Sequence, residues 1–321
     1  MASVGTLRLR LRRRLTRALG SRKNEAAILQ ANSNTEHMPL SKLSIKNATY
    51  LKDSSGIDVL HTDEPHALVM AAGYLKFILA KNKSEGIYFR GQRKIYENLS
   101  PTLYRETPSI KVQNAKHAAL AKLIDKFVSS GKIFNSFGEY AHEPLLQHYG
   151  INTTWMDLVD NVWVALWFAC HRAMAVGKRG EYVHFERRLP SPDEQYAYLL
   201  LVAADINHRS RDKPGYYHGD HTELVDLRMA APSVFLRPHA QHGLLFRKKG
   251  DTTGRALDYS SQLRGVIRVD LAKALDWLGS GKMVNTHSLF PPPFYDNGYQ
   301  LLLTCGVEGD VTTGTISHVG A

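Results

Sequence analysis

Cysteine is scarce in this sequence: Cys170 and Cys305 are the only two in 321 residues. Two cysteines cannot form a disulfide framework, and both lie in apolar runs, so we expect buried free thiols in a reducing compartment. No apolar run reaches the roughly 20 residues that a transmembrane helix requires. These absences favour a cytoplasmic protein without a membrane span.

Motifs for metal binding and for nucleophilic catalysis are also missing. The pairs His218/His221 and His239/His242 lack a third ligand at a recognised interval. The sequence therefore predicts solvated loop histidines and no metal site. No Gly-x-Ser-x-Gly segment occurs, which leaves serine hydrolase chemistry without support.

Acidic residues are absent from residues 1–23, which contain eight basic residues. The formal net charge of the whole chain is +11, but the remainder holds 33 basic against 30 acidic residues, a balance of only +3. The high charge therefore does not indicate a nucleic-acid groove across the fold. Three interpretations of residues 1–23 stay open: a solvated tail, a non-specific electrostatic contact with nucleic acid or anionic lipid, and an organellar presequence.

The chain divides into an arm and one domain. Residues 21 to about 58 are polar and show no sustained period, which predicts a basic, loosely ordered arm over residues 1–55. Hydrophobic residues make up 43% of the chain, enough for a sizeable core, and no linker interrupts residues 56–321. Helical patterns prevail in the first half and strand patterns in the second. This order predicts a single α+β domain with a mixed or antiparallel sheet rather than a doubly wound parallel sheet.

The stretch 143–173 organises the domain. Pro144 suits the first turn of a short helix, and Gly150 suits the position after its end. A second helix follows residues 157–161, which offer several candidate N-caps. Its apolar stripe runs from Trp163 through Cys170 to Met174, so we expect it to be buried. The polar residues between the two helices are thereby fixed to a core helix, as suits a functional site.

Four segments in chain order resemble the motifs of the FRG domain, a family of bacteria and their phages named for a Phe-Arg-Gly signature. They are residues 88–92 continuing to 99–105, residues 147–157 with 165–169, residues 237–246, and residues 288–298. The chain departs from the family pattern at Thr154, where the family usually has Arg, and at His242, where it has Gln. Leu158 and Val159 also replace the usual Trp and Thr. The resemblance implies an FRG-type fold but little chemistry.

The strand Tyr88-Phe89-Arg90-Gly91 is also similar to the first strand of Arg-Ser-Glu type ADP-ribosyltransferases. In that class the Arg holds the NAD diphosphate, a later Ser or Thr shapes the nicotinamide pocket, and a Glu orients the ribose. This chain has no Glu-x-Glu or Gln-x-Glu pair on a late strand, so the glutamate is unassigned. The similarity is one of fold-level analogy.

Each of the central polar residues has a functional and a structural interpretation. Arg90 either forks onto a phosphate or carboxylate of a ligand or forms a structural ion pair, for which Asp157 is the obvious partner. Gly91 lets a ligand or another backbone approach closely. His148 either performs acid–base chemistry or caps backbone carbonyls at its helix end. Asp157 either orients His148 or Arg90, or caps a helix.

The functional hypothesis places these motifs in one pocket on which Arg90, Gln92, His148, Asp157, Arg237 and Gln241 converge. His148 and Asp157 take the catalytic roles, and the ligand contacts fall to Arg90, Gly91, Gln92, Gln147, Tyr149, Thr153, Arg237 and Gln241. The leading function is an ADP-ribosyltransferase-like effector, in toxin or phage-defence settings, that acts on NAD. The alternatives are a non-catalytic module that binds a nucleotide, another anionic small molecule or nucleic acid, and a structural domain.

Overall fold

The protein is described by a computed structural model over residues 44–52, 56–79, 84–105, 107, 109–250, 257–279 and 284–320. Residues 1–23, for which the sequence left open a tail, a contact with nucleic acid or anionic lipid, and a presequence, lie outside the described residues. Of the arm predicted for residues 1–55, only residues 44–52 are described. They contain a strand, β1 (Ala48–Lys52), which pairs with β2 (Asp58–Thr62). Regular structure therefore begins before residue 56, because antiparallel pairing with the next strand in the chain orders a segment that has no strong period of its own.

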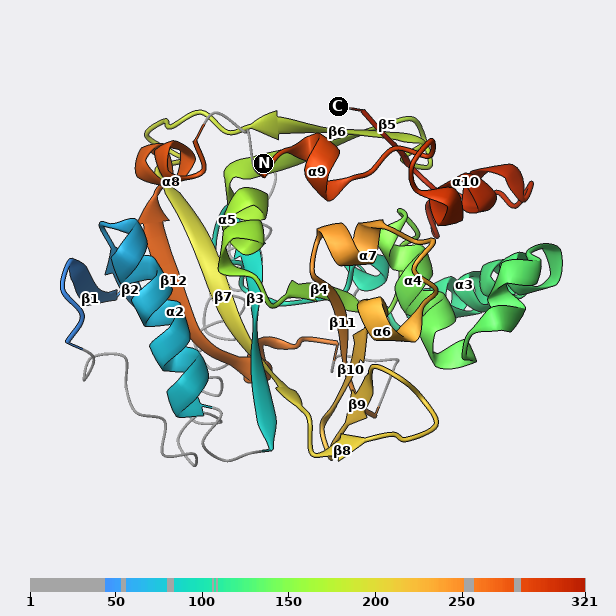
Figure 1. The fold of residues 1–321 in the computed structure, drawn as a ribbon, viewed down its shortest axis with the longest axis horizontal. Coiled ribbons are helices and arrows are strands. Elements are labelled where there is room, and N and C mark those ends of the chain that lie inside the picture. Colours follow the sequence, from blue (N-terminus) through green and yellow to red (C-terminus); the bar gives the residue numbers. More distant parts are fainter. Residues whose placement is uncertain are drawn as a thin grey trace, which may run out of the picture. The chain divides into compact units, whose positions relative to one another are not determined.

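Ten strands of the described residues form one large sheet (Figure 1). Neighbouring strands are antiparallel except for β2 and β12, which run parallel. This mixed sheet, together with the helices, confirms the predicted α+β class. The order is β1, β2, β12 (Leu263–Asp270), β7 (Tyr196–Asp205), β3 (Glu85–Gln92), β4 (Met156–Val159), β11 (Gly243–Lys248), β10 (Thr222–Asp226), β9 (Tyr216–His218) and β8 (His208–Arg209).

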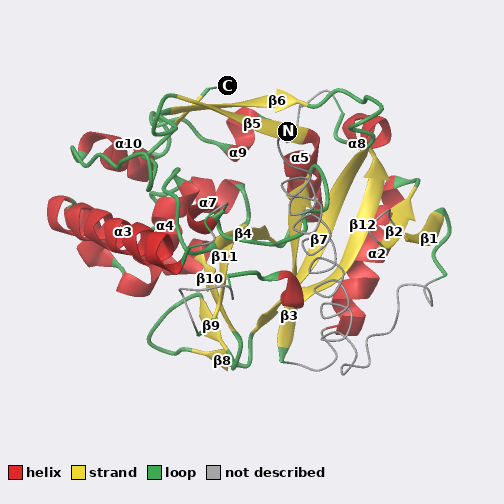
Figure 2. Cartoon of the chain, turned by 180° about the vertical axis from the view of Figure 1, so that it is seen from behind, coloured by secondary structure: helices red, strands yellow, loops and turns green. Residues whose placement is uncertain are grey.

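Helices cover this sheet in two groups, seen from behind in Figure 2. One core forms where α2 (Pro65–Leu79) packs on β3 and β12 and where α5 (Val162–Cys170) packs on β3 and β7. A second core joins the part of the sheet around β10 and β11 to α3, α4 and α10. The remaining described elements are α3 (Ile110–Ser130), α4 (His142–His148), α6 (Leu227–Ala230), α7 (Arg237–Ala240), α8 (Leu271–Trp277), α9 (Thr286–Leu289), α10 (Asn297–Thr304), the 3₁₀ turns Thr102–Tyr104, Lys132–Ser136, Glu139–Ala141 and Ser260–Gln262, and a small sheet of β5 (His171–Val176), β6 (Tyr182–Arg187) and β13 (His318–Val319).

Helix α4 and the turn after it follow from local sequence rules. Pro144 lies in the first turn of the helix, where its missing N–H has no intrahelical partner to lose. Gly150 adopts φ = +116°, and a Cβ at this position would lie 2.3 Å from the Ser317 hydroxyl. Only glycine fits both the conformation and the space. The turn therefore fixes Gln147 and His148 at the C-terminal end of α4, as predicted.

Helix α5 is the buried core helix that the sequence predicts, but it is shorter. The Asn161 side chain accepts hydrogen bonds from the backbone N–H groups of Trp163 and Val164 and so caps the helix start. The helix ends at Cys170, and Met174, expected on its apolar stripe, lies in β5. The chain turns into a strand there because residues 171–176 pair with β6 along their whole length.

The C-terminal end of α5 is stabilised by a buried cation. Arg188 is 3% exposed, and its Nη1 donates to the carbonyl of Ala169 at 2.6 Å. Its Nε lies 3.1 Å from a carboxylate oxygen of Glu194. A carbonyl that would otherwise be unpaired at the helix end thus receives a charge-assisted hydrogen bond. This fixes α5 against the strand that follows Glu194.

Candidate ligand site between strands β3 and β4

Strand pairing in the large sheet is nearly interrupted between β3 and β4. Strand β3 pairs with β7 over eight residues, but it pairs with β4 only through Phe89 and Val159. Strand β4 is fully paired on its other side, with β11. Backbone groups of β4 that face β3 beyond this single pair therefore need partners other than a neighbouring strand. We call the region next to Arg90 and Asp157 the β3–β4 opening.

Arg90 provides one such partner. Its Nη1 donates to the backbone carbonyl of Asp157 at 2.7 Å and not to the carboxylate, the partner expected from the sequence. Burial lowers the pKa of Arg90 to about 10, and the nearby Asp157 opposes that shift. The guanidinium therefore stays charged at neutral pH. Its Nε is buried and has no hydrogen-bond partner among the described residues, so this cation retains unused donor capacity.

Gly91 lies against helix α5. A Cβ on Gly91 would lie 1.9 Å from the carbonyl oxygen of Ala165 and 2.8 Å from the backbone nitrogen of Ala169. Of the two possibilities that the sequence left open, a ligand or another backbone, the structure places the backbone of α5 at this position. Gly91 thus allows β3 and α5 to pack closely, which holds Arg90 at the edge of the opening.

Asp157 is the exposed acid of the opening. Its side chain is 49% exposed, and Gln147 Nε2 donates to its Oδ2 at 2.8 Å. The Thr153 hydroxyl in turn donates to Gln147 Oε1, which fixes the orientation of the amide. The Thr153 oxygen also accepts from the backbone N–H of Trp155 at 3.1 Å. A short hydrogen-bonded chain therefore holds the carboxylate in place while it remains accessible.

His148 lies behind Asp157 and is almost entirely enclosed. Its side chain is 2% exposed, and its Nε2 is 4.0 Å from Asp157 Oδ1, too long for a hydrogen bond. Both ring nitrogens are buried without partners among the described residues. The ring packs on Gly243, where a Cβ would lie 2.2 Å from its Cε1. Burial lowers the pKa of His148 to about 4, although Asp157 raises it, so the imidazole is neutral at physiological pH.

The lowered pKa of His148 predicts how the unfolding free energy depends on pH. The folded pKa of about 4 lies below the ordinary 6.5, so protonation favours the unfolded chain. The contribution of His148 is complete above pH 6.5 and is lost as the pH falls towards 4. His148→Phe retains a ring over Gly243 and removes the titration. Between about pH 7 and pH 4.5 the variant should lose about 2 kcal/mol less unfolding free energy than the wild type.

Urea unfolding at the two pH values measures this difference. The pKa values of His61 and His171 are also lowered, mainly by burial. Their contribution is the same in both proteins and cancels. Equal pH dependence in the two proteins would show that the His148 ring is solvated.

Three predicted ligand residues lie deeper than the opening. The Tyr149 hydroxyl donates to the fully buried Asp296 at 2.7 Å. Arg237 is 2% exposed; its Nη1 donates to the carbonyl of His148 at 2.9 Å, and its guanidinium lies 4.5 Å from the centroid of the Tyr149 ring. Gln241 Nε2 donates to the carbonyl of Leu289 at 2.9 Å. These contacts join α4, α7, α9 and α10 and support the opening from behind.

The opening therefore collects only part of the predicted site. Gln92 is the last residue of strand β3. It is 9% exposed, and its Oε1 has no hydrogen-bond partner among the described residues. Sequence reasoning missed Tyr96 and Arg105, both close enough to influence the pKa of Arg90. Arg105 ends the first segment that resembles the FRG domain, which could have marked it, whereas Tyr96 lies in the loop after β3 and outside that segment. The residues that hydrogen bonds or short distances connect are Arg90, Gln147, His148, Thr153 and Asp157.

No group of three or more His, Cys, Asp or Glu side chains suited to a metal ion occurs in the part of the chain that the structure describes. In the same part, no helix is both long and apolar enough to cross a membrane.

Together, these features define an α+β protein whose sheet opens beside a half-buried arginine and an exposed carboxylate. The family model of the FRG domain matches residues 85–177, the segment that contains β3, α4, β4 and α5. Residues 85–177 thus match the FRG domain that the first two motifs predict, whereas the motifs at residues 237–246 and 288–298 lie outside the matched segment. No curated protein and no solved structure gives a match.

Proposed function

We propose that this protein is an ADP-ribosyltransferase-like effector that binds NAD at the β3–β4 opening. The observation that carries the proposal is the position of Arg90. Its charged guanidinium bonds the Asp157 carbonyl, has a buried Nε without a partner among the described residues, and lies close enough to Asp157, whose carboxylate is exposed, for that acid to raise its pKa. A guanidinium is the side chain best suited to a diphosphate, because it offers several donors in a fixed plane. Arg105 adds a second positive charge close to Arg90.

In this proposal Asp157 is the catalytic carboxylate of the opening. Cleavage of the bond between ribose and nicotinamide develops positive charge on the sugar, and a fixed carboxylate stabilises such a charge. Gln147 holds Asp157 Oδ2, which leaves the other oxygen to face the sugar or its hydroxyls. His148 is neutral and buried, so in this proposal it forms the wall behind Asp157 and maintains a low local dielectric.

A non-catalytic nucleotide-binding module is the second candidate, and Tyr96 favours it. This ring is 42% exposed, its hydroxyl accepts from Arg93 Nε at 3.2 Å, and the Lys94 ammonium lies 5.1 Å from its centroid. An exposed aromatic ring between cations is a surface on which a nucleobase stacks. This surface serves a sensor as well as an enzyme, so turnover separates the two candidates.

The setting of either activity, toxin action or phage defence in the cytoplasm, rests on the family resemblance. The buried free thiol of Cys170, with a pKa that burial raises to about 12, is consistent with a reducing compartment.

Release of nicotinamide from NAD tests the catalytic proposal. The wild type should release it, and Asp157→Asn should lower kcat about 100-fold or more, because the amide keeps the hydrogen bond to Gln147 but removes the charge. The KM for NAD should change little, since Arg90 still holds the diphosphate. Chromatography of the reaction mixture measures the product.

Two outcomes would contradict this proposal. Binding of NAD without nicotinamide release would identify the non-catalytic module. Release that is equally fast in the wild type and in Asp157→Asn would remove Asp157 from the mechanism.

A further inference from the structure

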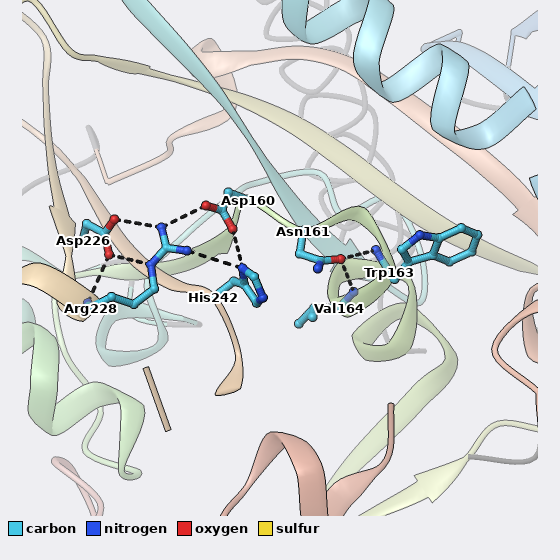
Figure 3. Close-up of polar contacts among 7 residues, drawn as sticks. All are labelled: Asp160, Asn161, Trp163, Val164, Asp226, Arg228 and His242. Atoms are coloured by element: carbon cyan, nitrogen blue, oxygen red, sulfur yellow. Dashed lines mark hydrogen bonds and ion pairs between the residues drawn. The ribbon is translucent and has the colours of Figure 1, made fainter. Parts of the chain in front are cut away.

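A chain of charged side chains ends in His242, the residue just before β11, and includes Asp160, the residue just after β4 (Figure 3). Arg228 binds Asp226 through its Nε and Nη2, each at 2.8 Å, and Asp160 through Nη2 at 2.9 Å. Asp160 Oδ1 lies 3.0 Å from His242 Nδ1. Asp226 also caps α6 by accepting from the backbone N–H of Arg228. Each carboxylate is thus held in place, and the imidazole is the end of the chain.

The contacts of His242 determine its tautomer. The Asp160 carboxylate is an acceptor, so at 3.0 Å the Nδ1 must carry the proton. Arg228 Nη1 lies 3.4 Å from the same nitrogen, but a guanidinium only donates, and the shorter contact with the carboxylate prevails. In the neutral imidazole the Nε2 nitrogen then carries the lone pair. The side chain is 41% exposed, which leaves it accessible to a substrate.

The backbone conformation of His242 is a second, independent observation that favours a role for its side chain. His242 adopts φ = +54° at the end of α7. Glycine or asparagine usually occupies such a position, and another residue is strained there by about 1 kcal/mol or more. The backbone alone would therefore favour glycine, and the imidazole is kept at a conformational cost.

His242 and Asp160 are next in the chain to residues that contact the β3–β4 opening. Its neighbour Gly243 packs directly under the His148 ring. Its partner Asp160 follows Val159, the residue through which β4 pairs with Phe89, next to Arg90. The dyad and the opening thus share strand β4 and the first residue of β11.

We propose that His242 is the base that accepts the proton of the incoming hydroxyl, and that Asp160 is the residue that positions it. The inference rests on the proposed function. The bond between C1′ of the ribose and the nicotinamide nitrogen breaks, and its electron pair stays with nicotinamide. The oxygen of water or of an acceptor hydroxyl forms the new bond to C1′, and its proton moves to Nε2 of His242. A base of this kind contributes roughly 10²–10⁴ in rate.

The catalytic test uses His242→Asn. Asparagine tolerates positive φ and can still hydrogen-bond to Asp160, so the variant should fold with wild-type stability. Its kcat for nicotinamide release should fall about 100-fold or more, while the KM for NAD stays within about threefold. Added imidazole should restore part of the rate. A wild-type kcat in this variant, or a loss that imidazole does not change, would overturn the assignment.

A second measurement does not depend on NAD. Diethyl pyrocarbonate acylates accessible neutral imidazole nitrogens, and mass spectrometry locates the product. His242 should react several-fold faster than the exposed His66 of α2, which has no carboxylate partner among the described residues. Asp160→Asn should slow His242 and leave His66 unchanged. Equal acylation rates at His242 and His66 would overturn the dyad. A wild type that does not cleave NAD would instead overturn the proposed function, and the transfer step with it.

Discussion

Replacement of Gly91 by alanine should prevent stable folding or lower the free energy of unfolding by about 4 kcal/mol or more. The added Cβ would lie 1.9 Å from the Ala165 carbonyl oxygen, which belongs to the backbone of the buried helix α5 and cannot rotate away. Strand β3 cannot move in the other direction without breaking its pairing with β7. Urea unfolding of the purified variant measures the loss.

Gly73→Ala is the matched control. Gly73 lies within α2, and a Cβ there would have no neighbour within 4 Å. The same substitution should raise stability by about 0.5–1 kcal/mol, because alanine favours the helix. If Gly91→Ala were as stable as this control, the close packing of β3 on α5 would be wrong, and so would the position of Arg90.

Arg90→Lys should abolish most of the affinity for ADP-ribose while leaving the ligand-free protein nearly as stable as the wild type. Lysine keeps the positive charge and can still reach the Asp157 carbonyl, but it loses the planar fork that a diphosphate engages. We expect an affinity loss of about 30-fold or more, in line with the 2–3 kcal/mol of charge-assisted hydrogen bonds. Thermal melting with and without ADP-ribose measures both quantities.

Arg179→Lys controls for the substitution itself. Arg179 pairs with Glu181 and Glu308 at the turn between β5 and β6, and its replacement should leave the response to ADP-ribose unchanged. The structural interpretation of Arg90 gives the opposite pattern, a less stable ligand-free protein that still responds fully to the ligand.

Local rules predicted much of the segment that carries the site. Pro144, Gly150 and Asn161 determine where α4 begins, where its turn forms and where α5 begins, and each acts on its nearest neighbours in the chain. For the same reason, Gln147 and His148 could be placed at a helix end from the sequence. Local rules also placed Arg90 on a strand before a glycine.

Long-range contacts determine the rest. The single residue pair between β3 and β4 creates the opening, and no spacing in the sequence encodes it. The partner of Arg90 is the carbonyl of Asp157, a backbone group that no side-chain motif reveals. The dyad of Asp160 and His242 joins residues 82 positions apart. Strand β1 is ordered by a nearer partner, the next strand β2, and composition alone could not reveal that pairing.

Calorimetric titration of ADP-ribose into the wild type and into Arg90→Lys tests the central claim most directly. We expect saturable binding to one site on the wild type and a dissociation constant about 30-fold or more higher for the variant. Equal affinity in the two proteins would place the ligand elsewhere, for instance in the cavity of about 610 Å³ that Tyr140, Trp155 and Arg247 help to line. That result would contradict the assignment of the β3–β4 opening as the ligand site.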